Sequence, residues 1–260
     1  MTEEIKAKFD KIGAWTGQSA IFHPDLIIKT IKKAGINYID IMLNDATGKN
    51  KKFHLFDDVK DVKESIKKIQ NESGVTVSVT SWVVPTQEWL DGMKNILVPL
   101  ILELDIEELC LDIEEPWIIP LSKKTKEEIQ HWSDLLKEAL SGYKGRISGS
   151  CIVYTNMEVV SPILEWCDVI IPQSYATVGN TAKLKAGVLE RLAYQKFSKF
   201  NKKIILGAAA WKLEGAYGLH ADAALRASLN AILELDVYQV RFWSLGWFND
   251  SISKIIKEYL

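Results

Sequence analysis

Three carboxylates end an apolar segment near the middle of the sequence. The segment is Ile106–Trp117, and its acids are Asp112, Glu114 and Glu115, followed by Pro116. Polar and apolar residues alternate before the acids, as they do in a β-strand that places successive side chains on opposite faces. We therefore expect Asp112 and Glu114 to share a face and Glu115 to point away from it. A solvated acidic loop is the alternative, but it gives no reason for the alternation.

Two carboxyl groups this close do not readily ionise together, because each negative charge disfavours the other. One member of the pair Asp112 and Glu114 is therefore expected to keep a proton near neutral pH, as a general acid does. Such a pair suits acid–base catalysis, provided that the rest of the chain holds both groups at a substrate.

Segments with the composition of β-strands recur along the whole chain, and helical segments follow nearly all of them. The strand segments are Ile12–Trp15, Ile36–Leu43, Val75–Trp82, Glu107–Glu114, Arg146–Tyr154, Asp168–Tyr175, Lys203–Trp211 and Val237–Leu245. The helical segments are Pro24–Ala34, Val59–Asn71, Thr86–Leu102, Lys126–Leu140, Lys183–Phe200, Ala221–Leu235 and Ser251–Tyr259. This α/β pattern in 260 residues predicts one domain over residues 1–260, a single (β/α)8 TIM barrel. A doubly wound open sheet is the alternative, but Gly13–Gly17 has too few glycines for its phosphate loop.

The active sites of TIM barrels lie at the carboxyl ends of the strands, so the residues at those ends are the candidate site. They are Trp15, Asp40, Asn44, Trp82, Asp112, Glu114, Glu115, Tyr154, Gln173, Tyr175, Trp211, Glu214 and Trp243. The predicted site is acidic and aromatic. Indole rings stack well on the apolar faces of sugars, although core packing is an alternative explanation for the tryptophans.

The predicted strand ends lack the residues that several other kinds of catalysis need. None of the four histidines lies at a strand end with a second metal ligand, so we expect no metal and no cofactor. A nucleophilic serine or cysteine lacks a Gly-x-Ser-x-Gly turn and a histidine partner. A lyase or aldolase needs a lysine at a strand end, for which Lys212 is the nearby candidate. Carboxylate chemistry on a sugar remains, which is glycoside hydrolysis.

Three strand ends resemble a known family. They are Asp112-Ile-Glu114, Gln173-Ser-Tyr175 and Phe242-Trp-Ser-Leu245. They are similar to the chitinase and endo-β-N-acetylglucosaminidase barrels of glycoside hydrolase family 18, whose fourth strand ends in Asp-x-x-Asp-x-Asp-x-Glu. The Asp-x-Glu end is also similar to the barrel lysozymes of family 25, although the first strand lacks the Asp usual there. Glu107 and Cys110 stand where the first two acids of the family 18 pattern lie.

The resemblance to family 18 implies a role for each matching residue. Glu114 is expected to be the general acid/base that protonates the leaving glycosidic oxygen. Asp112 is expected to orient the 2-acetamido group of the substrate, which replaces a protein nucleophile in this chemistry. Tyr175 and Gln173 are expected to bind that group. Tryptophans at the strand ends are expected to bind the sugar, with Trp243 as the floor; the others are Trp15, Trp82 and Trp211.

The sequence thus predicts a glycosidase that cleaves β-linked N-acetylhexosamine polymers, with peptidoglycan ahead of chitin. A catalytically inactive carbohydrate-binding barrel is the alternative, and Glu107 and Cys110 are the features that favour it. The net charge of −2 comes from 32 basic and 34 acidic residues spread through the chain, so we expect neither a nucleic acid nor a membrane as partner. We also expect a monomer.

The remaining expectations concern the cysteines and the location of the protein. The count of three cysteines is odd and includes no metal-binding spacing, so we expect buried free thiols. The charged start of the sequence does not resemble a secretion signal. We therefore expect a protein that is cytoplasmic when synthesised and that reaches a cell wall by release other than secretion, such as lysis.

Overall fold

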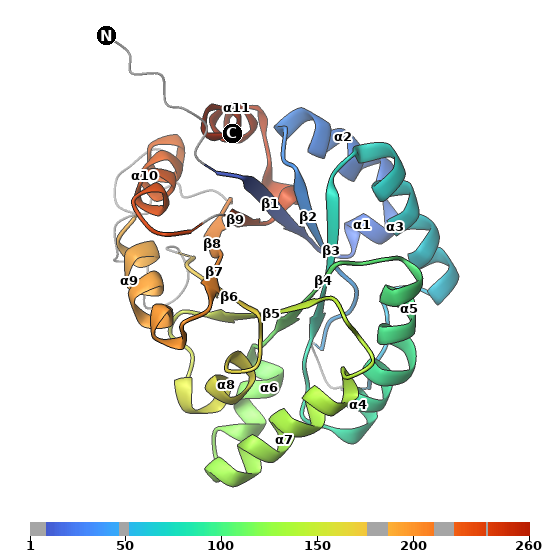
Figure 1. The fold of residues 1–260 in the computed structure, drawn as a ribbon. Coiled ribbons are helices and arrows are strands. Elements are labelled where there is room, and N and C mark those ends of the chain that lie inside the picture. The colour runs from blue at the N-terminus through green and yellow to red at the C-terminus, as the bar shows by residue number, and fades with distance from the viewer. Residues whose placement is uncertain (1–8, 47–51, 176–186, 211–220, 238) are drawn as a thin grey trace.

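The computed structural model describes residues 9–46, 52–175, 187–210, 221–237 and 239–260. Its strands form a closed ring that is surrounded by helices (Figure 1). The strands are β1 Lys11–Thr16, β2 Tyr38–Met42, β3 Thr76–Trp82, β4 Glu108–Asp112, β5 Arg146–Ile152, β6 Val169–Gln173, β7 Lys203–Ile204, β8 Leu206–Ala209 and β9 Gln239–Trp243.

Every pair of neighbouring strands is parallel, and the pairing of β1 with β9 closes the ring. The predicted seventh strand, Lys203–Trp211, is interrupted at Ile205, so that β7 and β8 occupy one position of the barrel between them. The predicted (β/α)8 TIM barrel is therefore confirmed.

The helices pack on the outside of the ring. They are α1 Ser19–Phe22, α2 Pro24–Ala34, α3 Val59–Ser73, α4 Gln87–Gly92, α5 Val98–Glu103, α6 Glu115–Leu121, α7 Lys126–Ala139, α8 Met157–Leu164, α9 Val188–Phe197, α10 Ala221–Leu233 and α11 Asp250–Tyr259. A π-helical turn, η1 Met93–Leu97, joins α4 to α5 and completes the predicted helix Thr86–Leu102. The three helices that the sequence did not predict, α1, α6 and α8, are short, and α6 and α8 each contain an internal proline.

One boundary differs from its prediction at the acids themselves. The fourth strand ends at Asp112, and Glu114 is the N-cap of α6 rather than a strand residue. Pro116 explains the difference, because proline fits the first turn of a helix and lacks the N–H that would extend the strand ladder. Glu115 lies in the first turn of that helix and is exposed.

Charged side chains fill the interior of the barrel below the acids. Arg241 of β9 is fully buried, and its guanidinium donates hydrogen bonds to Asp40 Oδ2 and Glu108 Oε1, each at 2.6 Å. Glu108 Oε1 also accepts from Ser148 Oγ at 2.7 Å, and Glu108 Oε2 accepts from Tyr38 at 3.0 Å. We call Arg241, Asp40, Glu108 and Tyr38 the ion layer. The predicted placement of Asp40 in the site is therefore wrong, because this carboxylate is held at Arg241 inside the barrel.

The acids of the ion layer respond differently to the same arginine. Burial raises the pKa of Glu108, but Arg241 and Arg146 outweigh burial and bring it down to about 2. Burial also raises the pKa of Asp40, and there the attraction of Arg241 does not offset it. Glu108 is thus firmly ionised, which fixes the position of Arg241 between the two acids.

An apolar layer separates the ion layer from the carboxyl end of the barrel. It consists of Trp15, Cys110, Val169, Ile171 and Ile205, with Trp243 packed against them. Alternate residues of β4 rise through the layers, from Glu108 through Cys110 to Asp112. All three cysteines are free and buried, as predicted.

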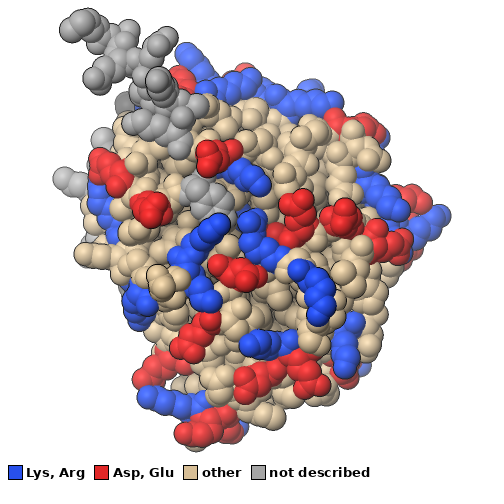
Figure 2. Space-filling model, viewed as in Figure 1, with Lys and Arg blue, Asp and Glu red and all other residues tan. Residues whose placement is uncertain are grey.

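Lysines, arginines and acids are interspersed on the face of the molecule that Figure 2 shows. A basic surface of the kind that binds nucleic acid is absent from the described residues of this face. Among the described residues no helix has the length and apolar character needed to cross a membrane.

The ion layer leads to a prediction about stability. Replacing Arg241 by alanine leaves Asp40 and Glu108 buried without their shared cation, and breaking a buried ion pair in this way costs about 3–5 kcal/mol. We expect Arg241→Ala to lower the free energy of unfolding by that amount in urea denaturation. Arg226→Ala, which breaks the exposed pair with Glu258, is the control and should unfold close to the wild type. Equal effects in the two variants would contradict the role of the ion layer.

Candidate active site

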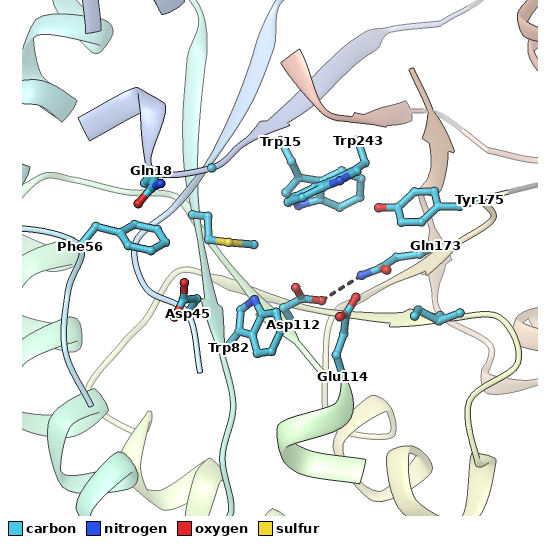
Figure 3. A pocket seen from close by; sticks show the side chains of 13 residues that line it. Trp15, Gln18, Asp45, Phe56, Trp82, Asp112, Glu114, Gln173, Tyr175 and Trp243 are labelled. Carbon is cyan, nitrogen blue, oxygen red and sulfur yellow. Dashed lines mark hydrogen bonds between the residues drawn. The ribbon is translucent and has the colours of Figure 1, made fainter. Parts of the chain in front are cut away.

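A pocket of about 470 Å³ opens at the carboxyl ends of the strands (Figure 3). Its lining includes the last residues of six strands: Met42 of β2, Trp82 of β3, Asp112 of β4, Ile152 of β5, Gln173 of β6 and Trp243 of β9. The full lining is Trp15, Gly17, Gln18, Met42, Asp45, Phe56, Trp82, Asp112, Glu114, Ile152, Gln173, Tyr175 and Trp243. The resemblance to family 18 gave a role to eight residues. Seven of them meet in this pocket, and the eighth, Trp211, lies outside the described residues.

The two acids reach the pocket from different elements. Asp112 is the last residue of β4 and is 6% exposed, whereas Glu114 is the first residue of the turn into α6. Their carboxyl groups lie side by side facing Gln173 (Figure 3). The shared direction expected from strand alternation therefore holds, although the strand stops before Glu114.

Gln173 orients Asp112. Its amide nitrogen donates to Asp112 Oδ1 at 2.9 Å and to Ser150 Oγ at 2.9 Å, which uses both N–H groups. The amide oxygen of Gln173 is buried without a partner among the described residues. A buried acceptor in that state is able to receive a hydrogen bond from a bound ligand.

The pKa values of both acids are shifted upward. Burial raises the pKa of Asp112 well above its usual range, and the charge of Glu114 raises it further, while the bond from Gln173 opposes the shift. Burial also raises the pKa of Glu114, with Gln173 lowering it and Glu115 adding a smaller increase. The pair therefore retains a proton at a higher pH than free carboxyl groups do, as general acid catalysis requires.

Tyr175 follows β6 and directs its hydroxyl into the pocket (Figure 3). Burial raises the pKa of the hydroxyl well above its usual value, and the charges of Asp112 and Glu114 raise it further. The hydroxyl consequently stays protonated and is able to donate a hydrogen bond to a ligand in the pocket.

Two tryptophans form the side of the pocket that lies across from Asp112 and Glu114 (Figure 3). The ring centroids of Trp15 and Trp243 are 6.4 Å apart, at an interplanar angle of 56°. Trp15 is only 2% exposed and supports Trp243, which is partly exposed. A cis peptide bond links Trp243 to Ser244. Because Trp243 is partly exposed and Trp15 is almost fully buried, Trp243 presents the larger surface to a ligand.

Sequence reasoning missed six residues that border the pocket, among them Gly17 after β1 and Ile152 at the end of β5. Gln18, Met42, Asp45 and Phe56 come from β2 and from the loops after β1 and β2. The predicted strand-end polar residue was Asn44, which directly precedes Asp45. Asp45 could have been predicted because it is the neighbour of Asn44 at the same strand end. Nothing in the sequence near Phe56 indicates a site.

Asn44 has a supporting role instead. It is fully buried, donates to Ser81 Oγ at 2.9 Å and accepts from the backbone N–H of Trp82 at 3.0 Å. It thereby fixes the end of β3, from which the Trp82 side chain enters the pocket.

The other residues predicted at strand ends lie outside the pocket or outside the described residues. Tyr154 is 44% exposed, outside the pocket, because β5 ends two residues earlier at Ile152. Glu115 is exposed on α6, as expected. Glu214 and Lys212 lie outside the described residues.

An acidic surface group is the arrangement nearest to a metal site within the described ranges. It consists of Asp57, Asp58 and Asp61, all of which lie outside the pocket. Asp58 is the N-cap of α3 and accepts a hydrogen bond from the backbone N–H of Asp61. Helix capping therefore explains why these two of the three acids lie together.

Neither a protein-family profile nor a curated protein matches the sequence. Solved structures match its fold. The GH18 chitinase ChiB of Flavobacterium johnsoniae aligns with a TM-score of 0.67 at 12% identity, over 97% of this chain and 94% of that one. The fold is a chitinase-like TIM barrel. The spore cortex-lytic enzyme SleL of Bacillus megaterium aligns with a TM-score of 0.61 at 12% identity, over 98% of this chain and 75% of that one.

An inhibitor protein has the same fold. The xylanase and α-amylase inhibitor protein XAIP-II of Scadoxus multiflorus aligns with a TM-score of 0.62 at 16% identity, over 96% of this chain and 97% of that one. At these identities the likeness concerns the fold and leaves activity to the site residues. The resemblance to the lysozymes of family 25 rests on the Asp-x-Glu sequence alone.

The environment of Glu114 leads to a second prediction. Removing the charge of Glu115 removes one cause of the raised pKa of Glu114, so Glu115→Gln should lower that pKa. Carbon-13 NMR titration of the side-chain carboxyls measures the shift directly. Glu165→Gln removes an exposed carboxylate at the end of α8 and should leave the titration of Glu114 unchanged. A pKa of Glu114 that is the same in all three proteins would contradict the assignment.

Proposed function

We propose that this protein is a glycoside hydrolase that cleaves β-linked N-acetylhexosamine polymers. The observation that carries the proposal is the pair of buried Asp112 and partly buried Glu114, with raised pKa values, in a pocket faced with indole rings. The chitinase-like fold supports it. Proton donation and sugar stacking both need such a pocket.

Glu114, Asp112 and Tyr175 each have a separate role in the proposed hydrolysis. Glu114 donates its proton to the glycosidic oxygen while the carbonyl oxygen of the substrate's 2-acetamido group attacks the anomeric carbon. Asp112, held by Gln173, accepts the acetamido N–H and stabilises the positive charge that develops on that group. Tyr175 donates to the acetamido oxygen. Water then attacks the anomeric carbon, and the Glu114 carboxylate takes its proton.

A second candidate is a carbohydrate-binding barrel without catalysis. The match to an inhibitor protein favours it, and the sequence departs from the family 18 pattern at Cys110, where that pattern has an acid. Both candidates require sugar binding in the pocket. They differ in whether Glu114 transfers a proton.

The decisive experiment replaces the proposed acid. Loss of a positioned general acid lowers the rate by about two to four orders of magnitude. We expect Glu114→Gln to lose cleavage of chitin oligomers and cell-wall glycan to that extent while retaining oligosaccharide binding and thermal stability. We expect Asp112→Asn to be severely impaired and Glu115→Gln, the control, to stay active. Wild-type turnover in Glu114→Gln would refute the mechanism.

Binding is tested separately from cleavage. Because Trp243 is the more exposed indole of the pair, amino-sugar oligomers should quench the tryptophan fluorescence, and Trp243→Ala should lose most of the response. Trp247→Ala is the control, since that indole is 53% exposed outside the pocket. Saturable quenching by an inactive wild-type protein would favour the binding barrel. The absence of quenching with every amino-sugar oligomer would exclude both candidates.

A further inference from the structure

The pocket extends beyond the groups that the proposed reaction uses. Asp45, Phe56 and Gln18 lie on the far side of the acids from Gln173 and Tyr175 (Figure 3). Met42 and Trp82 complete this part of the pocket. We call the five residues Gln18, Met42, Asp45, Phe56 and Trp82 the side lobe.

The side lobe has the chemistry of a sugar site. Phe56 and Met42 provide apolar surface, and Asp45 provides a partly buried carboxylate. The indole N–H of Trp82 is buried without a partner among the described residues, and in the view of Figure 3 it lies between the carboxyl groups of Asp45 and Asp112. A buried donor without a partner is unfavourable until a ligand or water accepts from it. Apolar faces with a few convergent polar groups are typical of small-ligand sites.

The charge of the pocket restricts which sugar fits. Asp45, Asp112 and Glu114 contribute three carboxyl groups, and the lining holds no lysine, arginine or histidine among the described residues. A cleft lined by groups of one sign attracts ligands of the opposite sign and repels those of its own. A sugar with a carboxylate, such as muramic acid, is therefore disfavoured next to Asp45.

We propose that the side lobe binds an N-deacetylated hexosamine, whose ammonium group pairs with the Asp45 carboxylate. The ammonium group also lies near the aromatic rings of Phe56 and Trp82, which attract cations. The inference rests on the proposed hydrolase in one respect: the sugar at Asp112 and Glu114 keeps its acetamido group, and the sugar in the side lobe is its neighbour. Among amino-sugar glycans, a partly N-deacetylated one is thus favoured over peptidoglycan.

The first test reads the sequence of the cleavage products. The protein digests partly N-deacetylated chitin, and mass spectrometry identifies the sugars on either side of each cleaved bond. We expect glucosamine to be enriched about fivefold at one position beside the reactive N-acetylglucosamine, as a partly buried ion pair allows. Asp45→Asn should remove the enrichment, because the amide lacks the charge and keeps the shape.

A matched control removes a carboxylate of the same type elsewhere. Asp134→Asn on α7 changes an exposed residue outside the pocket and should retain the enrichment. Cleavage without any preference for glucosamine in the wild type would overturn the inference and leave the hydrolase standing. The same preference in Asp45→Asn as in the wild type would also overturn it.

The second test does not depend on catalysis. Glucosamine tetramers and N-acetylglucosamine tetramers are titrated into Glu114→Gln, with and without Asp45→Asn, and tryptophan fluorescence reports binding in the pocket. We expect the glucosamine tetramer to bind about fivefold more weakly after Asp45→Asn, and 0.5 M NaCl to weaken its binding in the presence of Asp45. The acetylated tetramer should show little salt dependence.

The two tests separate the inference from the proposed function. If no glycan is cleaved but the glucosamine tetramer binds in an Asp45-dependent manner, the hydrolase proposal fails and the side lobe keeps its assignment. If Asp45→Asn leaves glucosamine binding unchanged, the assignment of the side lobe is wrong whatever the protein cleaves.

Discussion

The interaction on which the site depends is the buried contact of Arg241 with Asp40 and Glu108. Arg241 comes from β9, Asp40 from β2 and Glu108 from β4, so one guanidinium ties together three strands that are not neighbours around the ring. Charged groups inside a barrel are tolerated only when they are paired and hydrogen-bonded. Cys110 of the apolar layer lies between Glu108 and Asp112 on β4, and Asp112 is the last residue of that strand, at the pocket. The position of Asp112 is thus fixed by the register of β4, which Glu108 holds through its contact with Arg241 inside the barrel.

The sequence predicted the barrel because eight alternations of strand and helix leave few other architectures. It predicted the pocket because strand ends in a barrel converge, which is why Trp82, Asp112, Gln173 and Trp243 meet. Tyr154 was misplaced because β5 ends at Ile152, and Asp40 because its partner is distant in the sequence. An acid such as Asp40 looks the same in the sequence whether it faces a substrate or an arginine of a distant strand, and Arg241 follows it by 201 positions.

Loops limit what the sequence reveals about the site. The end of β4 was predicted two residues late, since Glu114 continues the alternation of the strand while it caps a helix. Asp45 and Phe56 reach the pocket from a connection that has neither a strand nor a helix period, so no periodicity marks them. The side lobe could therefore be recognised only from the structure. It restricts which sugar fits the pocket.

Cys110 bears on the choice between an enzyme and a binding barrel, and the ion layer gives it a physical explanation. A carboxylate at this position would lie between Glu108 and Asp112 on β4, and near Asp40, with Arg241 as the fully buried cation that faces them. Burial and these acids raise the pKa of the Cys110 thiol, so it adds no charge. The raised pKa of Asp112 comes first from burial and then from Glu114, and neither cause needs an acid at position 110. The loss of that acid therefore leaves the proton-holding pair intact, and Cys110 is not evidence against catalysis.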